Sequence, residues 1–117
     1  MSDFNVLTRN VGKVNVIDVK GYLDAHTAPE LENEFNKLIR GSKYNVVVNF
    51  NDLTYISSAG LGVFMAYVET MRENNGDIKF SNMKDDVFNI FDLLGFPVLY
   101  EFFKEEGEAI KKFNDLK

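Results

Sequence analysis

The chain has 117 residues, of which 45% are hydrophobic and 14% aromatic, a composition typical of one folded globular domain and not of a disordered segment. A formal net charge of −5 at pH 7 argues against direct nucleic-acid binding, which needs a basic surface, and the lack of cysteine excludes disulfides and thiolate metal sites. No signal-peptide pattern follows Met1, and the longest apolar run, residues 61–68, is too short to span a bilayer. We therefore expect a soluble cytoplasmic protein that does not bind a membrane.

The N-terminal third of the sequence predicts a hairpin followed by a helix. Residues 4–7 and 14–19 have the composition of two strands, joined around the turn signal Asn10-Val11-Gly12. The segment Thr27-Ala28-Pro29-Glu30 predicts a capping box, in which polar side chains bond the free N–H groups at a helix start. The helix that begins there is expected to end near Gly41.

The middle third predicts a buried strand, a polar turn and a long helix. Val46-Val47-Val48 is a continuous β-branched run, as expected of a central parallel strand. The helix is expected to begin at about Ser58 and to end at Asn74 or Asn75, before Gly76. Its core-facing stripe is predicted to consist of Leu61, Phe64, Met65, Val68 and Met71.

The last third predicts two further strands and two helices. In chain order these are a strand around residues 78–80, a helix over 85–94, a short strand over 98–102 and an amphipathic helix over 104–116. The complete pattern is β-β-α-β-α-β-α-β-α. Such alternation predicts an α/β fold with a mostly parallel sheet of four to five strands, an antiparallel first strand at the edge, and helices packed mainly on one face.

The junction between the third strand and the long helix is the main candidate site. A helix start there would aim free N–H groups and a positive dipole end at Ser57 and Ser58, an environment that suits a phosphate on a serine. The alternative is an ordinary helix N-cap. Gly60 and Gly62, which each cost a helix up to about 1 kcal/mol relative to Ala, favour close approach of a ligand or partner. Close packing of the helix on a neighbouring element is the alternative for both glycines.

Two other sites are weaker candidates. Ser58, His26 and Asp24 nominally supply a hydrolase triad, but the nucleophile-elbow pattern is missing and His26 has the position of a solvated loop residue. Asp24 either approaches Ser58 from the end of the neighbouring strand or bonds nearby N–H groups in its own turn. One histidine and scattered carboxylates give no metal-ligand spacing, and Gly60-Leu61-Gly62 matches no nucleotide-binding loop. We expect neither a metal nor a cofactor.

The outer edge of the long helix is a candidate docking surface. At about 100° per residue, Val63 and Ala66 are predicted to lie away from the core-facing stripe and beside Gly62. A small apolar patch next to Ser58 has the character of a protein docking surface, although scattered apolar surface residues are also ordinary.

Residues 52–63, Asp-Leu-Thr-Tyr-Ile-Ser-Ser-Ala-Gly-Leu-Gly-Val, resemble the phosphoacceptor segment of the bacterial anti-sigma factor antagonists, which are STAS domains. Weaker similarities at residues 21–24, 27–28 and 87–95 extend the resemblance over nearly the whole chain. The resemblance implies one STAS domain over residues 1–117 that is not an enzyme. It also implies that the unmodified protein binds an anti-sigma factor, often a serine kinase, and frees a sigma factor. Phosphorylation of Ser58 would end that binding, and a phosphatase would restore it.

The expected partner-binding residues surround the predicted phosphoacceptor Ser58. One departure from the family pattern is Ser57, which replaces the usual acidic residue before the acceptor and leaves open slower phosphorylation of Ser58 or modification of Ser57 itself. A STAS scaffold or ligand-sensing module without phosphorylation is the main alternative, and a small serine hydrolase is a second one. The partner-binding residues we expect are Asp24, Ser57, Ala59, Gly60, Gly62, Val63 and Ala66.

Overall fold

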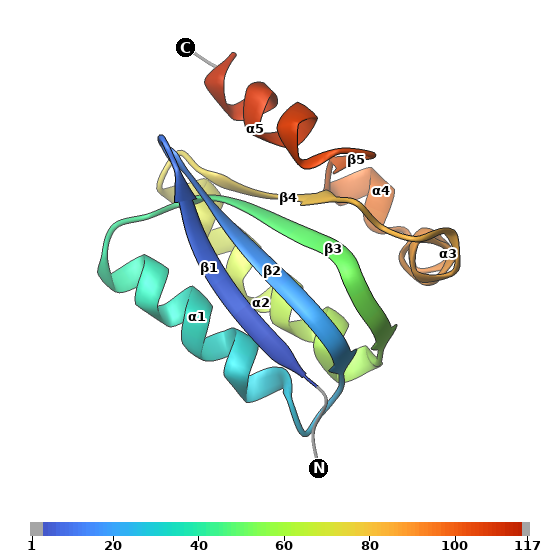
Figure 1. Ribbon diagram of the computed structural model, residues 1–117. Helices are drawn as coiled ribbons and strands as arrows, with labels where there is room; N and C mark the ends of the chain where they lie inside the picture. The colour runs from blue at the N-terminus through green and yellow to red at the C-terminus, as the bar shows by residue number, and fades with distance from the viewer. Residues whose placement is uncertain (1–3, 116–117) are drawn as a thin grey trace.

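A five-stranded mixed sheet forms the centre of the protein, with its strands side by side in sequence order. The computed structural model describes residues 4–115 (Figure 1). The first two strands pair antiparallel, and the remaining neighbours pair parallel. The strands are β1 (Asn5–Val11), β2 (Val14–Leu23), β3 (Asn45–Ile56), β4 (Asp77–Ser81) and β5 (Phe102–Phe103). The predicted α/β fold class, with an antiparallel strand at one edge, is therefore confirmed.

Three of the helices pack on one face of this sheet around a core rich in phenylalanine. These helices are α1 (Ala28–Arg40), α2 (Ser58–Glu73) and α3 (Asp85–Leu93). Phe80 on β4 is central to the core, since its ring makes edge-on contacts with the rings of Phe50 and Phe64 at centroid distances of 5.3 and 5.2 Å. Phe91 of α3 joins the same cluster, 5.5 Å from Phe80. Aromatic burial of this kind is the main source of stability for a small domain.

The last helix, α5 (Glu106–Asn114), lies on the opposite face of the sheet. There Ala109 packs against Val14, Val16 and Val47, which alternate along β2 and β3 with residues of the main core. The apolar runs of these two central strands are thus buried on both faces. Most of the helices share one face as predicted, and α5 is the exception. Helix α5 ends at Asn114, and its predicted end, Leu116, lies outside the described residues. Met1–Asp3, part of the N-terminal segment expected to carry no signal peptide, also lie outside them.

Several predicted boundaries are wrong, since β1 and β2 each extend four residues beyond the strands predicted over 4–7 and 14–19. The third strand continues through the expected polar turn to Ile56, because residues 52–56 still pair with β2. Of the short strand predicted over 98–102, Val98 and Leu99 instead belong to the helix α4 (Phe96–Leu99), and the strand β5 begins only at Phe102. Gly95, with φ of 78°, ends α3 as predicted, and Pro97 in the first turn then favours a new helical turn. No helix within residues 4–115 is long and apolar enough to cross a membrane.

Candidate functional site

The predicted junction lies where β2 and β3 end side by side. Leu23 and Ile56 are the last paired residues of the two strands, and the Ser57 N–H donates to the Leu23 carbonyl at 2.9 Å. Asp24 and Ser57 therefore leave the sheet at adjacent positions, and α2 begins immediately afterwards. This is the carboxyl edge of the parallel strands, the edge at which open α/β sheets usually carry their sites.

The two serines have different roles at this helix start. Ser57 is the N-cap: its backbone is extended and its hydroxyl accepts from the Gly60 N–H at 3.5 Å. Ser58 is the first helical residue and is exposed, and its hydroxyl makes no hydrogen bond to any residue within 4–115. Ser57 and not Ser58 therefore caps the helix, and the Ser58 hydroxyl lies free at the positive end of the α2 dipole.

The two glycines of the first turns also differ. Gly60 is buried, and a Cβ there would lie 2.8 Å from Leu23 Cγ and 3.0 Å from Ile56 Cγ1, so packing of α2 on the strand ends explains this glycine. At Gly62, a Cβ would meet no heavy atom of residues 4–115 within 4 Å apart from its chain neighbours and the adjacent backbone of α2 itself. Gly62 is exposed and keeps the outer surface low. Gly60 is a packing residue, and Gly62 remains available to a partner.

The prediction that Val63 points away from the core is wrong. Val63 is only 3% exposed and belongs to the main core, whereas Met65, predicted to be inside, is 59% exposed. The cause is the contact between α2 and α1: the Tyr67 ring stacks on Phe35 at 5.0 Å and its hydroxyl donates to Asn36 at 3.0 Å. These contacts bring the Val63 side of α2 towards α1.

The exposed side of α2 is consequently a different set of residues from the predicted one. Ala66 and Ala59 are exposed as expected, and they share their side of the helix with Ser58 and Gly62. We call this surface the α2 outer face; it consists of Ser58, Ala59, Gly62, Met65, Ala66 and Glu69.

Asp24 adopts the turn role and not the role of a partner for Ser58. Its carboxylate Oδ1 accepts from the backbone N–H groups of His26 at 2.9 Å and Thr27 at 3.1 Å. The Thr27 hydroxyl donates to the Tyr22 carbonyl at 2.8 Å and accepts from the Asp24 N–H at 3.0 Å, so the predicted capping box does not form. Within residues 4–115, no hydrogen bond joins the His26 side chain to Asp24 or to Ser58. The triad geometry needed by the hydrolase alternative is therefore missing.

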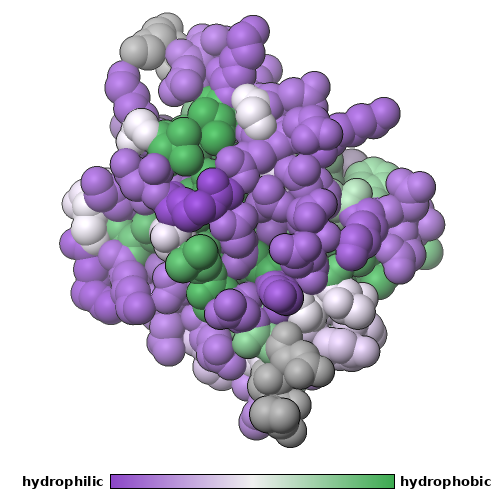
Figure 2. Space-filling model, viewed as in Figure 1, coloured by the Kyte–Doolittle hydropathy of each residue, from purple (hydrophilic) through white to green (hydrophobic). Residues whose placement is uncertain are grey.

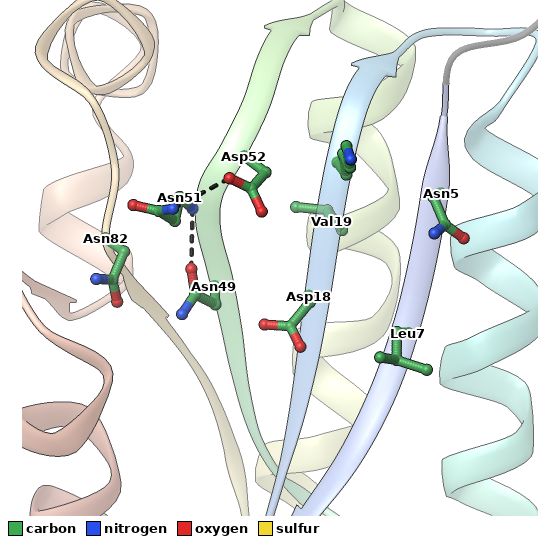
Figure 3. Close-up of a pocket in the computed structure, with 9 residues that line it drawn as sticks. Asn5, Leu7, Asp18, Val19, Asn49, Asn51, Asp52 and Asn82 are labelled. Atoms are coloured by element: carbon green, nitrogen blue, oxygen red, sulfur yellow. Dashed lines mark hydrogen bonds between the residues drawn. The ribbon is translucent and has the colours of Figure 1, made fainter.

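A polar cavity of about 580 Å³ lies on the other face of the sheet, beside α5 (Figure 3). Its polar lining comes from four strands or strand ends, and several of these groups are already bonded to one another or to a neighbour. The Asn51 N–H donates to Asn49 Oδ1 at 2.9 Å, and Arg9 pairs with Asp18 at 2.6 Å. Ser58 is not among the lining residues, so this cavity is separate from the junction. The sequence did not single it out, because asparagines scattered over distant strands form no local motif.

Charged groups at that cavity anchor α5. The Arg9 guanidinium, which also bonds Glu106 at 2.6 Å, holds the pKa of the Glu106 carboxyl below its usual range. Asn49 Nδ2 donates to the same carboxylate at 2.9 Å and lowers that pKa further. Through this ion pair and hydrogen bond, Glu106 attaches the start of α5 to the sheet.

Comparison with known proteins places this geometry in a family. The STAS domain family model matches residues 5–109. The anti-sigma-B factor antagonist of Staphylococcus aureus (strain NCTC 8325 / PS 47) is 26% identical over 93 residues, which are 80% of this chain and 86% of that protein.

Two solved structures share the fold. An anti-sigma factor antagonist from Mycobacterium paratuberculosis superposes with a TM-score of 0.86 at 20% identity, covering 96% of this chain and 97% of that chain. The Bacillus protein SpoIIAA, solved in unphosphorylated and phosphorylated forms, gives a TM-score of 0.72 for each form. The two forms are 18% and 20% identical, with coverage of 97% and 94% of this chain and 99% and 98% of theirs. Because the STAS family model matches residues 5–109, which are nearly the whole chain, the chain belongs to the STAS domain family.

Proposed function

We propose that this protein is an anti-sigma factor antagonist controlled by phosphorylation of Ser58. The observation that carries the proposal is the free, exposed Ser58 hydroxyl at the first position of α2, next to a serine that already supplies the helix cap. The name of the Staphylococcus aureus relative and the two solved forms of SpoIIAA support the same role. In this role the protein is a regulated binding module and the substrate of a kinase, acting in the cytoplasm where the anti-sigma factor is.

The unmodified protein binds its anti-sigma factor through the junction and the α2 outer face. Asp24, Ser57, Ala59, Gly62 and Ala66 remain in the proposed contact surface, since they are exposed or partly exposed around Ser58. Gly60 and Val63 are excluded from it because both are buried. The side chains of Ala59, Gly62 and Ala66 are small, so a partner can approach the backbone of α2 closely.

A phosphate on Ser58 would reverse this binding for an electrostatic reason. It adds about −1.5 to −2 charges at neutral pH. Within the free protein, the N–H groups of the first turn of α2 stabilise that charge without refolding. A partner packed on the α2 outer face would instead have to desolvate a dianion, which costs several kcal/mol when no cation faces it. The serine kinase, often the anti-sigma factor itself, and a phosphatase then set the fraction of protein able to bind.

Titration calorimetry with the purified anti-sigma factor of the organism that encodes this chain tests the proposal. Ser58→Ala should bind as tightly as the wild type, because Ser57 and not Ser58 caps α2. Ser58→Asp should bind at least tenfold more weakly. With kinase and ATP, mass spectrometry should find phosphate on Ser58 and none on the Ser58→Ala variant.

The same measurements separate the remaining alternatives. Equal affinity of wild type and Ser58→Asp would reject the switch and leave a STAS module that does not respond to phosphate. Phosphate found on Ser57 in place of Ser58 would assign the switch to the cap residue.

A further inference from the structure

Four large aliphatic side chains lie exposed within seven residues at the end of α3 and along α4. Their exposed fractions are 86% for Leu93, 59% for Leu94, 87% for Val98 and 62% for Leu99. In the view of Figure 1, Figure 2 shows hydrophobic atoms at the surface on the α3 side of the molecule, at the right. Single exposed apolar residues are ordinary, but a cluster of this size is typical of an interaction surface.

Other side chains pack this segment on the core. Phe91, Phe96 and Tyr100 anchor it: the Phe96 ring lies 5.1 Å from the ring of Phe91 and stacks on Tyr100 at 5.1 Å. All three anchors are buried. Polar residues at the four exposed positions would therefore keep the same anchors, so their apolar character requires another explanation.

The α4 end of the cluster lies beside the C-terminal end of α2. Arg72 of α2 donates to the Leu99 carbonyl and lies over the Tyr100 ring at 5.5 Å, so its side of α2 faces α4. Met65 is seven residues earlier, two helical turns away on that same side, and is 59% exposed. Met65 is exposed on α2 between this contact and the surface around Ser58, so we take it as the link between the two surfaces. We call the combined surface the α2–α4 patch; it consists of Met65, Leu93, Leu94, Val98 and Leu99.

The charges beside the patch select its partner. Glu69 is four residues after Met65 on α2, Asp86 is seven residues before Leu93 on α3, and Asp92 precedes Leu93. All three carboxylates are exposed and form no ion pair within residues 4–115. A second copy of this chain would bring like charges together, whereas a partner with basic residues beside apolar ones would complement the patch.

We propose that the α2–α4 patch is the second half of the anti-sigma factor binding surface, and that it receives an apolar helix flanked by Lys or Arg. This inference rests on the proposed function. Specific complexes bury about 800 Å² on each partner, and the small side chains of Ala59, Gly62 and Ala66 supply little of that area. The patch supplies the apolar area, and Ser58 supplies the control.

The experiment measures affinity for the purified anti-sigma factor by titration calorimetry, with Leu93→Lys as the variant. Leu93 is almost fully exposed, so the variant should keep the circular dichroism spectrum and melting temperature of the wild type. Its affinity should fall at least tenfold, because the introduced cation is desolvated against an apolar, basic partner. The matched control is Leu7→Lys, the same exchange at an exposed leucine on β1, which should bind like the wild type.

The possible results separate this inference from the proposed function. If wild type binds, Ser58→Asp does not, and Leu93→Lys binds like Leu7→Lys, the patch inference is wrong and the function stands. If the wild type binds no anti-sigma factor, the function and the inference are both rejected. If sedimentation shows that the free wild type is a dimer and Leu93→Lys a monomer, a second copy covers the patch and the inference is overturned.

Discussion

The two faces of the sheet are held to their helices by different forces. The face under α1, α2 and α3 is a continuous apolar core with phenylalanine rings at its centre. The face under α5 has a small apolar contact and several charged ties, among them Lys79, which is buried between Asp77, Glu101 and the Phe113 ring. Among residues 4–115, Lys79 is the one buried charged side chain, and it has opposite charges beside it.

Val63→Lys should give the largest effect, because it places a cation on the apolar face. Val63 is buried in the apolar core cluster, whereas Lys79 has the carboxylates of Asp77 and Glu101 beside it. We expect a loss of about 3 kcal/mol or more in the free energy of unfolding, enough to unfold much of the protein.

Urea denaturation followed by circular dichroism measures this loss, with Ala66→Lys on the exposed side of α2 as the control, which should unfold like the wild type. A Val63→Lys variant as stable as Ala66→Lys would show that the apolar face accommodates charge, and the contrast between the two faces would fail.

Replacing each of the two α2 glycines, Gly60 and Gly62, by alanine tests how tightly the apolar face is packed. Gly60→Ala should destabilise by about 1–3 kcal/mol, since the new methyl group meets Leu23 and Ile56 at contacts too short for an unmoved Cβ. Gly62→Ala should leave stability unchanged or raise it by up to about 1 kcal/mol, because Ala favours helix and the position is open.

Thermal unfolding of both variants gives these values, and calorimetry with the anti-sigma factor gives the second readout. Gly62→Ala should bind the partner more weakly although it is folded. If Gly62→Ala is less stable than the wild type, Gly62 is required for internal packing and is not part of the docking surface.

Glu106→Gln should give the smallest effect and the one that depends on pH. Arg9 holds the pKa of Glu106 below its usual value in the folded protein, so the charged tie is complete above the unfolded-state pKa. As pH falls through the lower folded-state pKa, the carboxylate takes up a proton and that contribution to stability is lost. Since Arg9 is partly exposed, we expect Glu106→Gln to cost only about 1 kcal/mol at pH 7.

Melting temperatures of wild type and Glu106→Gln between neutral and acid pH check this sign. The difference between the two proteins should be largest at neutral pH and should shrink as pH falls. A difference that grows in acid would mean that the charged Glu106 does not stabilise the attachment of α5.

The sequence by itself determined the features that depend on neighbouring residues. The hairpin around Gly12, the helix start after Ser57 and the end of α3 before Gly95 are local signals, since each depends on backbone conformation or caps within a few residues. The candidate junction followed from them, because parallel strands end at a common edge.

Only the tertiary structure decided which side of each element is covered. Apolar residues surround most of α2, so its periodicity allowed several rotations, and the contacts of Tyr67 with α1 selected the one that buries Val63 and exposes Met65. The position of α5 depends on Val14, Val16 and Val47 from distant strands, and the exposed α2–α4 patch depends on which aromatic rings fill the core. These choices come from contacts between residues far apart in the chain, whose energies no local pattern contains.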